Sequence, residues 1–360
     1  MTVRLPRNLH PGAWWLWALG LATAASRTTN PLLLLLIAAA AGLVVVNRRS
    51  QAPWTLAFRL YLLLGCCVVT GRVVFRIIFG GGEGEHILFT LPQIPLPAWA
   101  AGIRLFGPVA AEQLLGGLYD GLRLATMLIC LGAANALANP KRMLKAMPSA
   151  LYEVGVAVTV ALSVAPQLAE SVLRVRRARK LRGGAQRGMR ALHGIVIPVL
   201  EDSLDRSLAL AAAMDSRGYG RTGDLPRRIR LLTGALVLAG LSGVCVGVYG
   251  VLDATTPRYL GLPMLGTGLL VATAGFVIGG RGVRRTVYRP DRWRPAETLV
   301  ALCGLGTGAL LFLTAEVDAA DLYPSLSPLS WPELPLLSAF AVLAGALPAW
   351  LAPPPPRSSV

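Results

Sequence analysis

Long apolar runs alternate with shorter polar and basic segments along most of the chain. The runs approach or reach the roughly 20 residues that an α-helix needs to cross a bilayer. They cover about residues 14–25, 31–46, 54–79, 122–137, 151–168, 231–252, 260–280, 296–315 and 336–351. This pattern predicts an all-α polytopic membrane protein with roughly six to nine transmembrane helices.

The segment between residues 80 and 118 follows the pattern less clearly. A glycine-rich stretch at residues 80–85 is followed by four prolines between residues 92 and 108. Glycine and proline favour turns and interrupt helices. The sequence therefore leaves open whether this segment crosses the bilayer, re-enters it or lies flat on it.

Basic side chains are concentrated between residues 167 and 230, outside the apolar runs. They are Arg174, Arg176, Arg177, Arg179, Lys180, Arg182, Arg187, Arg190, Arg206, Arg217, Arg221, Arg227, Arg228 and Arg230. Apolar residues at helical spacing predict two amphipathic helices here, one ending at Gly183 and one following Pro198 and ending at Gly218. In the second helix Asp202 lies four residues before Arg206, the spacing of a surface ion pair.

The distribution of charge indicates which segments face the cytoplasm, because Lys and Arg are retained on that side during insertion. We predict that residues 167–230 and the basic loop 281–294 are cytoplasmic, and that the acidic loop between residues 316 and 333 faces outward. The chain then divides into an N-terminal transmembrane bundle (1–166), a cytoplasmic domain (167–230), C-terminal transmembrane helices (231–352) and a proline-rich tail (353–360).

One conflict in this topology concerns a smaller basic cluster, Lys141, Arg142 and Lys145. If residues 80–118 do not cross, this cluster shares the side of Arg48 and Arg49, but the apolar run at 151–168 then carries the larger cluster to the opposite side. One of the two clusters must break the charge rule, and the larger one has the stronger claim to the cytoplasm.

Composition supports a membrane protein and argues against a nucleic-acid binder. Of the 360 residues, 54% are hydrophobic and 15% are charged, and the mean hydropathy is +0.58. Soluble domains carry about 25% charged residues. The net charge of +17 would also suit nucleic acid, but a nucleic-acid binder has no reason to place its basic stretches between membrane-spanning runs. We expect contact with membrane lipid and none with nucleic acid.

Side chains typical of catalytic or metal sites are sparse. The five cysteines lie in apolar runs without a Cys-x-x-Cys pair, so they predict neither disulfides nor a zinc site. Of the three histidines only His86 has carboxylates nearby, Glu83 and Glu85, in a glycine-rich loop. No Gly-x-x-x-x-Gly-Lys-Ser/Thr loop occurs, so ATP hydrolysis must come from another chain. We therefore predict no catalytic residues, no metal and no cofactor.

The most specific feature is a short signature that occurs twice, as Leu181-Arg182-Gly183 and as Ser216-Arg217-Gly218. Each copy ends a predicted cytoplasmic helix and sets a guanidinium beside a helix-stopping glycine. There the planar donor fork of arginine can reach a carboxylate or a carbonyl of a partner. An ordinary helix end also favours arginine and glycine, but two copies in the one large predicted extramembrane region favour docking.

These residues resemble the transmembrane T component of energy-coupling factor (ECF) transporters, a family that includes the cobalt-transport permeases. The second box of that family is similar to the segment Ala212-Ala213-Met214-Asp215-Ser216-Arg217-Gly218-Tyr219-Gly220, and the first box is similar to Ala178-Arg179-Lys180-Leu181-Arg182-Gly183. Leu181 and Ser216 stand where alanine is commoner. Similarity extends to residues 10–14, 29–31 and 288–293 and so covers nearly the whole chain.

The resemblance implies a non-catalytic subunit of an importer in the plasma membrane of a bacterium. Its two cytoplasmic helices dock on a pair of ABC-type ATPases, with Arg182 and Arg217 engaging acidic residues of each ATPase. Leu181, Gly183, Ser216 and Gly218 complete the two boxes, and the supporting surface consists of Arg179, Asp202, Arg206 and Asp215. A separate substrate-binding (S) subunit takes up a vitamin or a metal ion.

Two other functions remain as alternatives. A self-contained secondary transporter needs repeated halves and broken helices around a midplane site, and no convincing internal repeat is visible. A lipid-modifying membrane enzyme needs a nucleophile, a base or metal ligands near the membrane surface. His86 with its neighbouring glutamates is the nearest approach to such a site.

Overall fold

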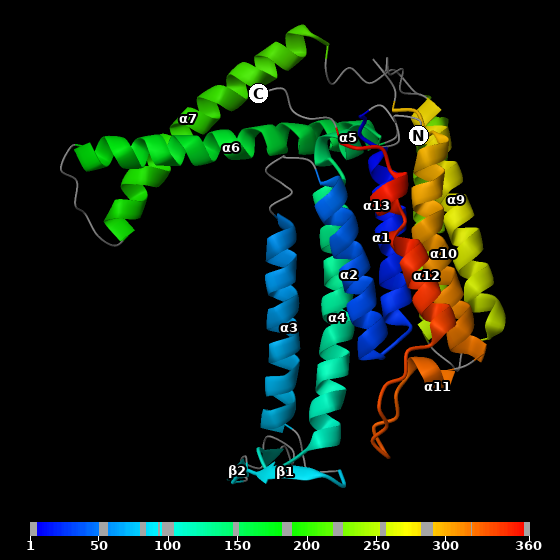
Figure 1. The fold of residues 1–360 in the computed structure, drawn as a ribbon. Helices are drawn as coiled ribbons and strands as arrows, with labels where there is room; N and C mark the ends of the chain where they lie inside the picture. Colours follow the sequence, from blue (N-terminus) through cyan, green and yellow to red (C-terminus); the bar gives the residue numbers. More distant parts are fainter. Residues whose placement is uncertain are drawn as a thin grey trace. The chain divides into compact units, whose positions relative to one another are not determined.

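The computed structural model describes residues 6–49, 57–79, 84–92, 94–95, 104–146, 151–181, 189–218, 226–252, 257–281, 291–317 and 319–355. The chain forms two compact units, one of residues 1–143 and 291–360 and the other of residues 144–290. Seven described helices are long and apolar enough to cross a membrane, namely α2, α3, α4, α6, α8, α9 and α10 (Figure 1). This confirms the predicted all-α polytopic membrane protein, whereas its predicted division into four parts stays a prediction.

The first unit is a helical bundle with two small antiparallel sheets. Its helices are α1 (Pro11–Ser26), α2 (Pro31–Arg48), α3 (Ala57–Phe79), α4 (Ala111–Leu137), α10 (Pro295–Val317), α11 (Ala319–Leu322), α12 (Leu336–Ala346) and α13 (Pro348–Leu351). Its strands are β1 (Ile87–Thr90), which pairs with β4 (Pro108–Ala110), and β2 (Ile94–Pro95), which pairs with β3 (Arg104–Leu105). The short α5 (Pro140–Lys145) lies at the boundary of the two units.

Local capping explains where the first two helices begin. Each has proline at its first position, where the missing N–H costs no hydrogen bond and the fixed φ suits a helix. The residue before each proline caps the helix: His10 Nδ1 accepts from the Gly12 N–H at 3.1 Å, and Asn30 Oδ1 accepts from the Leu32 N–H at 3.0 Å. His10 and Asn30 are therefore the N-caps of α1 and α2.

The core of the first unit lies where α1 packs against α10. Trp17 and Leu21 of α1 are fully buried, and the indole N–H of Trp17 donates to the Gly345 carbonyl at 2.8 Å. Gly20 and Gly304 lie at the contact, and a Cβ on either would overlap the backbone of the other helix. The two helices therefore approach closely enough for their backbones to touch, as small residues allow in membrane proteins.

The two ends of this bundle differ in charge. At one end, here called the basic end, Arg7 pairs with Glu297, Arg48 Nε donates to the Ala349 carbonyl, and Arg142 pairs with Asp291. At the opposite end Thr28 and Asn30 bond to backbone carbonyls of Leu322 and Glu333. The chain's first described residues, the start of α10 and the end of α13 therefore share the basic end.

The segment after α3 returns to the end of the bundle from which it left, opposite the basic end (Figure 1). The N–H of Phe106 donates to the Ile78 carbonyl at 2.8 Å, and the N–H of Ala111 donates to the His86 carbonyl at 2.9 Å. The described residues between 84 and 110 form strands and contain no helix. Their pairing closes α3 and α4 into an antiparallel hairpin, which answers the question that the sequence left open.

Helix α4 begins at Ala111, well before the apolar run at residue 122 that predicted it. Gly117 and Gly121 lie against Arg76 and Val69 of α3, and Asp120 forms an ion pair with Arg76 at 3.7 Å. Small and charged residues lower the hydropathy of this turn, although its packing on α3 keeps it helical.

The second unit contains α6 (Tyr152–Leu181), α7 (Met189–Ser216), α8 (Arg227–Leu252), a 3₁₀ turn at Arg258–Leu260 and α9 (Leu262–Arg281). Helices α8 and α9 form an antiparallel pair in which Gly240, Gly243 and Gly247 contact Ala272, Gly268 and Leu265 in turn. Gly243 and Gly247, which are spaced four apart, thus serve helix packing within the chain.

Candidate functional site

Helices α6 and α7 cross each other in the second unit, and a polar contact holds the crossing (Figure 1). The buried hydroxyl of Ser171 on α6 donates to Asp202 Oδ2 on α7 at 2.6 Å. Arg206 Nε donates to Asp202 Oδ1 at 3.1 Å, and the guanidinium of Arg174 lies 3.9 Å from Asp202. The carboxylate of Asp202 therefore links the two helices, and its negative charge offsets part of the positive charge of the two arginines.

The environment of Asp202 favours its charged form. The hydrogen bond from Ser171 is the largest influence that lowers the pKa of this carboxyl below its usual value, and the charges of Arg206 and Arg174 lower it further. Partial burial acts in the opposite direction and is outweighed. At neutral pH Asp202 is therefore ionised, and its contacts with both helices are complete.

A groove of about 380 Å³ follows the crossing between α6 and α7. Most of its lining is apolar or small, with Asp202 and Arg206 on the α7 side. The leucines that predicted an apolar stripe on α7 stay uncovered within the chain: Leu200, Leu204 and Leu208 are 54%, 60% and 68% exposed. This amphipathic surface is open to a partner or to lipid.

The start of α7 corrects the sequence prediction, which placed a helix after Pro198. The helix begins at Met189 and includes Pro198, whose missing N–H leaves the carbonyl four residues earlier without its usual helical donor. That residue is Gly194, and the guanidinium of Arg179 on α6 lies over it, so close that a Cβ there would be 2.7 Å from Arg179 Nη1. Packing on α6 outweighs the local preference of proline.

The end of α7 forms the tip that the sequence predicted. The N–H groups of Arg217 and Gly218 donate to the carbonyls of Met214 at 3.1 Å and Asp215 at 2.9 Å. Gly218 has φ +75°, a left-handed conformation that glycine adopts without a steric penalty and that ends many helices. The Ser216 hydroxyl bonds to the Ala213 carbonyl within the last turn.

The side chains of this tip point away from the described part of the chain. Arg217 and Asp215 are exposed, and Arg217 has no carboxylate partner among the described residues. At the end of α6, Leu181 is 89% exposed, while Arg182 and Gly183 lie outside the described residues. The structure thus joins Asp202 and Arg206 at the crossing and sets Arg179 against Gly194, nearer the start of α7. Both places are separate from the tip formed by Ser216, Arg217 and Gly218.

Sequence reasoning missed Ser171, the residue that links α6 to Asp202. It lies 31 positions from its partner on a different helix, so no local spacing marks the pair. Arg174 was counted only as part of a basic cluster, because a pattern of charges does not reveal which arginine meets a carboxylate. The pair of Asp202 and Arg206 was found because both residues lie on one helix.

Comparison with known proteins places the chain in a family. The family model described as cobalt transport protein (CbiQ) matches residues 2–226, more than half of the chain. The energy-coupling factor transporter transmembrane protein EcfT of Lactococcus lactis subsp. cremoris is 25% identical over 184 residues, which are 45% of this chain and 64% of the relative. The EcfT protein of Streptococcus equi subsp. equi is 28% identical over 212 residues, 56% of this chain and 75% of the relative.

The family match includes the N-terminal helices of the first unit together with α6 and α7, which carry the candidate site. The chain spans slightly less than two thirds of the Lactococcus relative and three quarters of the Streptococcus relative. These findings confirm the resemblance to the transmembrane component of ECF transporters that the two arginine boxes indicated. The chain belongs to the cobalt transport protein (CbiQ) family.

Proposed function

We propose that this chain is the energy-coupling transmembrane subunit of an ECF-type importer. In this role it docks on two ABC-type ATPases in the cytoplasm and passes their movement to a separate substrate-binding subunit that takes up a vitamin or a metal ion. The observation that carries the proposal is the crossed pair of α6 and α7, in which α7 ends in a capped tip with an exposed Arg217. The names of the two relatives support the same role.

Chain connectivity supports a cytoplasmic position for the crossed helices. The segment 144–290 leaves and rejoins the first unit at the basic end, because Arg142 and Asp291 pair there. The segment must therefore cross the membrane an even number of times. Of its three helices that are long enough to cross, α8 and α9 pack as an antiparallel hairpin. If α8 and α9 both cross, these two crossings already make an even number, so α6 does not cross.

Charge supports the same orientation. The basic end carries Arg7, Arg48 and Arg142, and the opposite end carries Asp321 and Glu333. Because basic residues are retained in the cytoplasm during insertion, the basic end faces the ATPases in this proposal. Both basic clusters then lie on one side, and the conflict between them does not arise if α6 does not cross.

The two arginines act as docking groups in this proposal. A guanidinium at a helix end offers a planar fork of donors that matches a carboxylate of a partner. Arg217 is available for such a contact because it has no carboxylate partner in the described part of the chain. Arg182 is assigned the same role from its position in the first box. The exposed leucines of α7 and the apolar groove provide a surface for the substrate-binding subunit.

Reversing the docking charges tests the proposal. We expect Arg217→Glu combined with Arg182→Glu to lower recovery of the ATPases with tagged chain by roughly tenfold or more, since breaking a desolvated charge pair costs a few kcal/mol. Recovery is measured by purification in mild detergent after co-expression with the ATPases encoded nearby. Arg228→Glu is the matched control, because Arg228 is an exposed arginine of the same unit outside both boxes. Undiminished recovery with the double variant would refute the docking role.

A further inference from the structure

The two units are joined by the chain at only two places, between residues 143 and 144 and between residues 290 and 291. Arg142 lies next to the first of these places and Asp291 lies at the second. These residues form an ion pair across 149 positions of sequence. They are here called the junction pair, because their contact holds both chain connections together.

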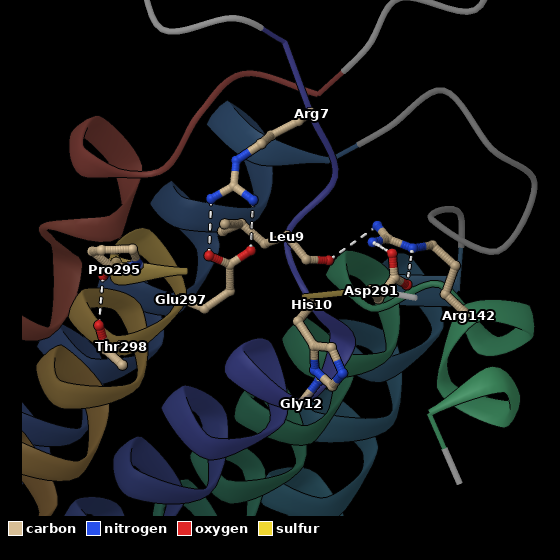
Figure 2. A network of polar contacts seen from close by, with 9 residues as sticks. All are labelled: Arg7, Leu9, His10, Gly12, Arg142, Asp291, Pro295, Glu297 and Thr298. Atoms are coloured by element: carbon tan, nitrogen blue, oxygen red, sulfur yellow. Dashed lines mark hydrogen bonds and ion pairs between the residues drawn. The ribbon is translucent and has the colours of Figure 1, made fainter. Parts of the chain in front are cut away.

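The junction pair has the geometry of a strong and directional contact (Figure 2). Arg142 Nε donates to Asp291 Oδ2 at 2.9 Å, and Arg142 Nη2 donates to Asp291 Oδ1 at 2.8 Å. Two parallel hydrogen bonds fix the orientation of arginine and carboxylate as well as their separation. The side chains are 21% and 35% exposed, so water screens the pair only in part.

A third contact anchors the junction pair in the first unit. Arg142 Nη1 donates to the Leu9 carbonyl at 3.1 Å. The segment that contains Leu9 is itself held on both sides. Arg7 makes two hydrogen bonds of 2.8 Å to the buried Glu297 (Figure 2), and the ring centroids of His10 and Trp293 lie 5.3 Å apart. The first-unit ends of both chain connections, at Arg142 and Asp291, are therefore fastened to the bundle.

We propose that the junction pair is the joint through which movement of the second unit is transmitted to the first. This rests on the proposed function, in which ATPases move α6 and α7. Two independent connections would each absorb part of a displacement through backbone rotation. A bidentate pair that is also bonded to Leu9 holds the first-unit ends of the two connections together. These ends then move together and not independently. Arg142 and Asp291 are positioning residues that convert ATPase closure into a defined movement of the bundle.

A distance measurement between the units tests this without knowledge of the substrate. Spin labels are attached to Val46→Cys on α2 and Ala209→Cys on α7, both exposed positions, after the five native cysteines are replaced by serine. Pulsed electron paramagnetic resonance then records the distance in the complex with its ATPases, first without nucleotide and then with ATP and vanadate. We expect one narrow distance population that shifts on nucleotide binding.

Variants of the junction pair should lose this response. In Arg142→Gln and Asp291→Asn we expect a broadened distribution and loss of most of the nucleotide-dependent shift. The exchange of charges, Arg142→Asp with Asp291→Arg, should restore at least part of the shift, as a direct interaction requires. ATPase recovery should stay at the level of the unmodified chain in all of these variants.

Asp120→Asn is the matched control, since Arg76 and Asp120 form an ion pair of the first unit at the end of the bundle opposite the basic end, away from the junctions. It should leave the shift intact. A normal shift in the junction variants would overturn the proposal, and so would an equal loss of the shift in the control. Failure of the unmodified chain to recover ATPases would instead refute the proposed function and the joint together.

Discussion

The carboxylate of Asp202 accepts hydrogen bonds from two helices, from Ser171 on α6 and from Arg206 on its own helix. Both contacts are stronger with the ionised form, which the lowered pKa of Asp202 preserves. A group whose pKa is lower in the folded state than in the unfolded chain stabilises the fold above the unfolded value. That stabilisation is lost as the pH falls through the folded value.

We therefore predict that acid loosens the crossing of α6 and α7. Below about pH 4, the usual pKa of aspartate, Asp202 begins to lose its charge and hydrogen exchange of the amides around residues 171 and 202 should rise, after correction for the intrinsic effect of pH. Asp202→Asn should show the faster exchange already at pH 7, with little further change on acidification. Asp205→Asn, an exposed position on the same helix, should behave like the unmodified chain. Equal protection of both variants at pH 7 would show that the ion pairs do not hold the crossing.

At the scale of the element, the contact between α1 and α10 depends on glycine. Gly304 lies against the backbone of Trp17, whereas a Cβ on Gly306, two residues along the same helix, would meet no atom of the described residues within 4 Å. The two glycines lie on one helix at nearly the same depth, and they differ in their surroundings. They therefore separate the effect of close packing from the general effect of glycine on helix stability.

We predict that Gly304→Ala destabilises the first unit by about 1–3 kcal/mol, the usual range for overpacking a tight contact. Gly306→Ala should be neutral or should stabilise the protein by up to about 1 kcal/mol, because alanine is the better helix former. Thermal unfolding of the purified chain in detergent, followed by tryptophan fluorescence, measures both. A pair of variants with the same midpoint would mean that α1 and α10 lie further apart than described.

Individual helices could be predicted from the sequence far better than the contacts between them. The apolar runs identified nearly all of the long helices, because burial in lipid imposes hydrophobicity along the whole length of a span. The run at residues 122–137 missed the first turns of α4, since packing of Gly117 and Gly121 on α3 replaces hydrophobicity there. Pro198 predicted a helix start and lies inside α7, because contact with Arg179 outweighs a local preference.

The candidate site was predictable only where its signal is local. The box of Ser216, Arg217 and Gly218 is contiguous, and Gly218 ends the helix as its lack of a Cβ suggested. Ser171 and Asp202 meet only because two helices cross, and Arg142 and Asp291 meet only because the chain returns to the basic end after a whole second unit. Neither helical periodicity nor charge counting carries information on such contacts.

At the scale of the whole molecule, the proposed membrane topology rests on the contacts of the first unit together with chain connectivity. Counting apolar runs predicted that one basic cluster must lie outside, because the run at 151–168 was counted as a span. The pair of Arg142 and Asp291 requires an even number of crossings between them. Helix α6 is long and apolar enough to cross. If it crossed, an even total would require that only one of α8 and α9 crosses, although the two form a hairpin.

We therefore predict a specific labelling pattern for single cysteines in a cysteine-free background. In intact cells a membrane-impermeant maleimide should modify Ser330→Cys, which is exposed at the end of the bundle opposite the basic end. It should modify Arg49→Cys and Ser216→Cys only after the membrane is permeabilised, because all basic segments then share the cytoplasm. If α6 crossed, Arg49→Cys and Ser216→Cys would lie on opposite sides. Labelling of Ser216→Cys in intact cells would therefore exclude the end of α7 as a docking surface for cytoplasmic ATPases, and labelling of Arg49→Cys alone would show that α6 crosses the membrane.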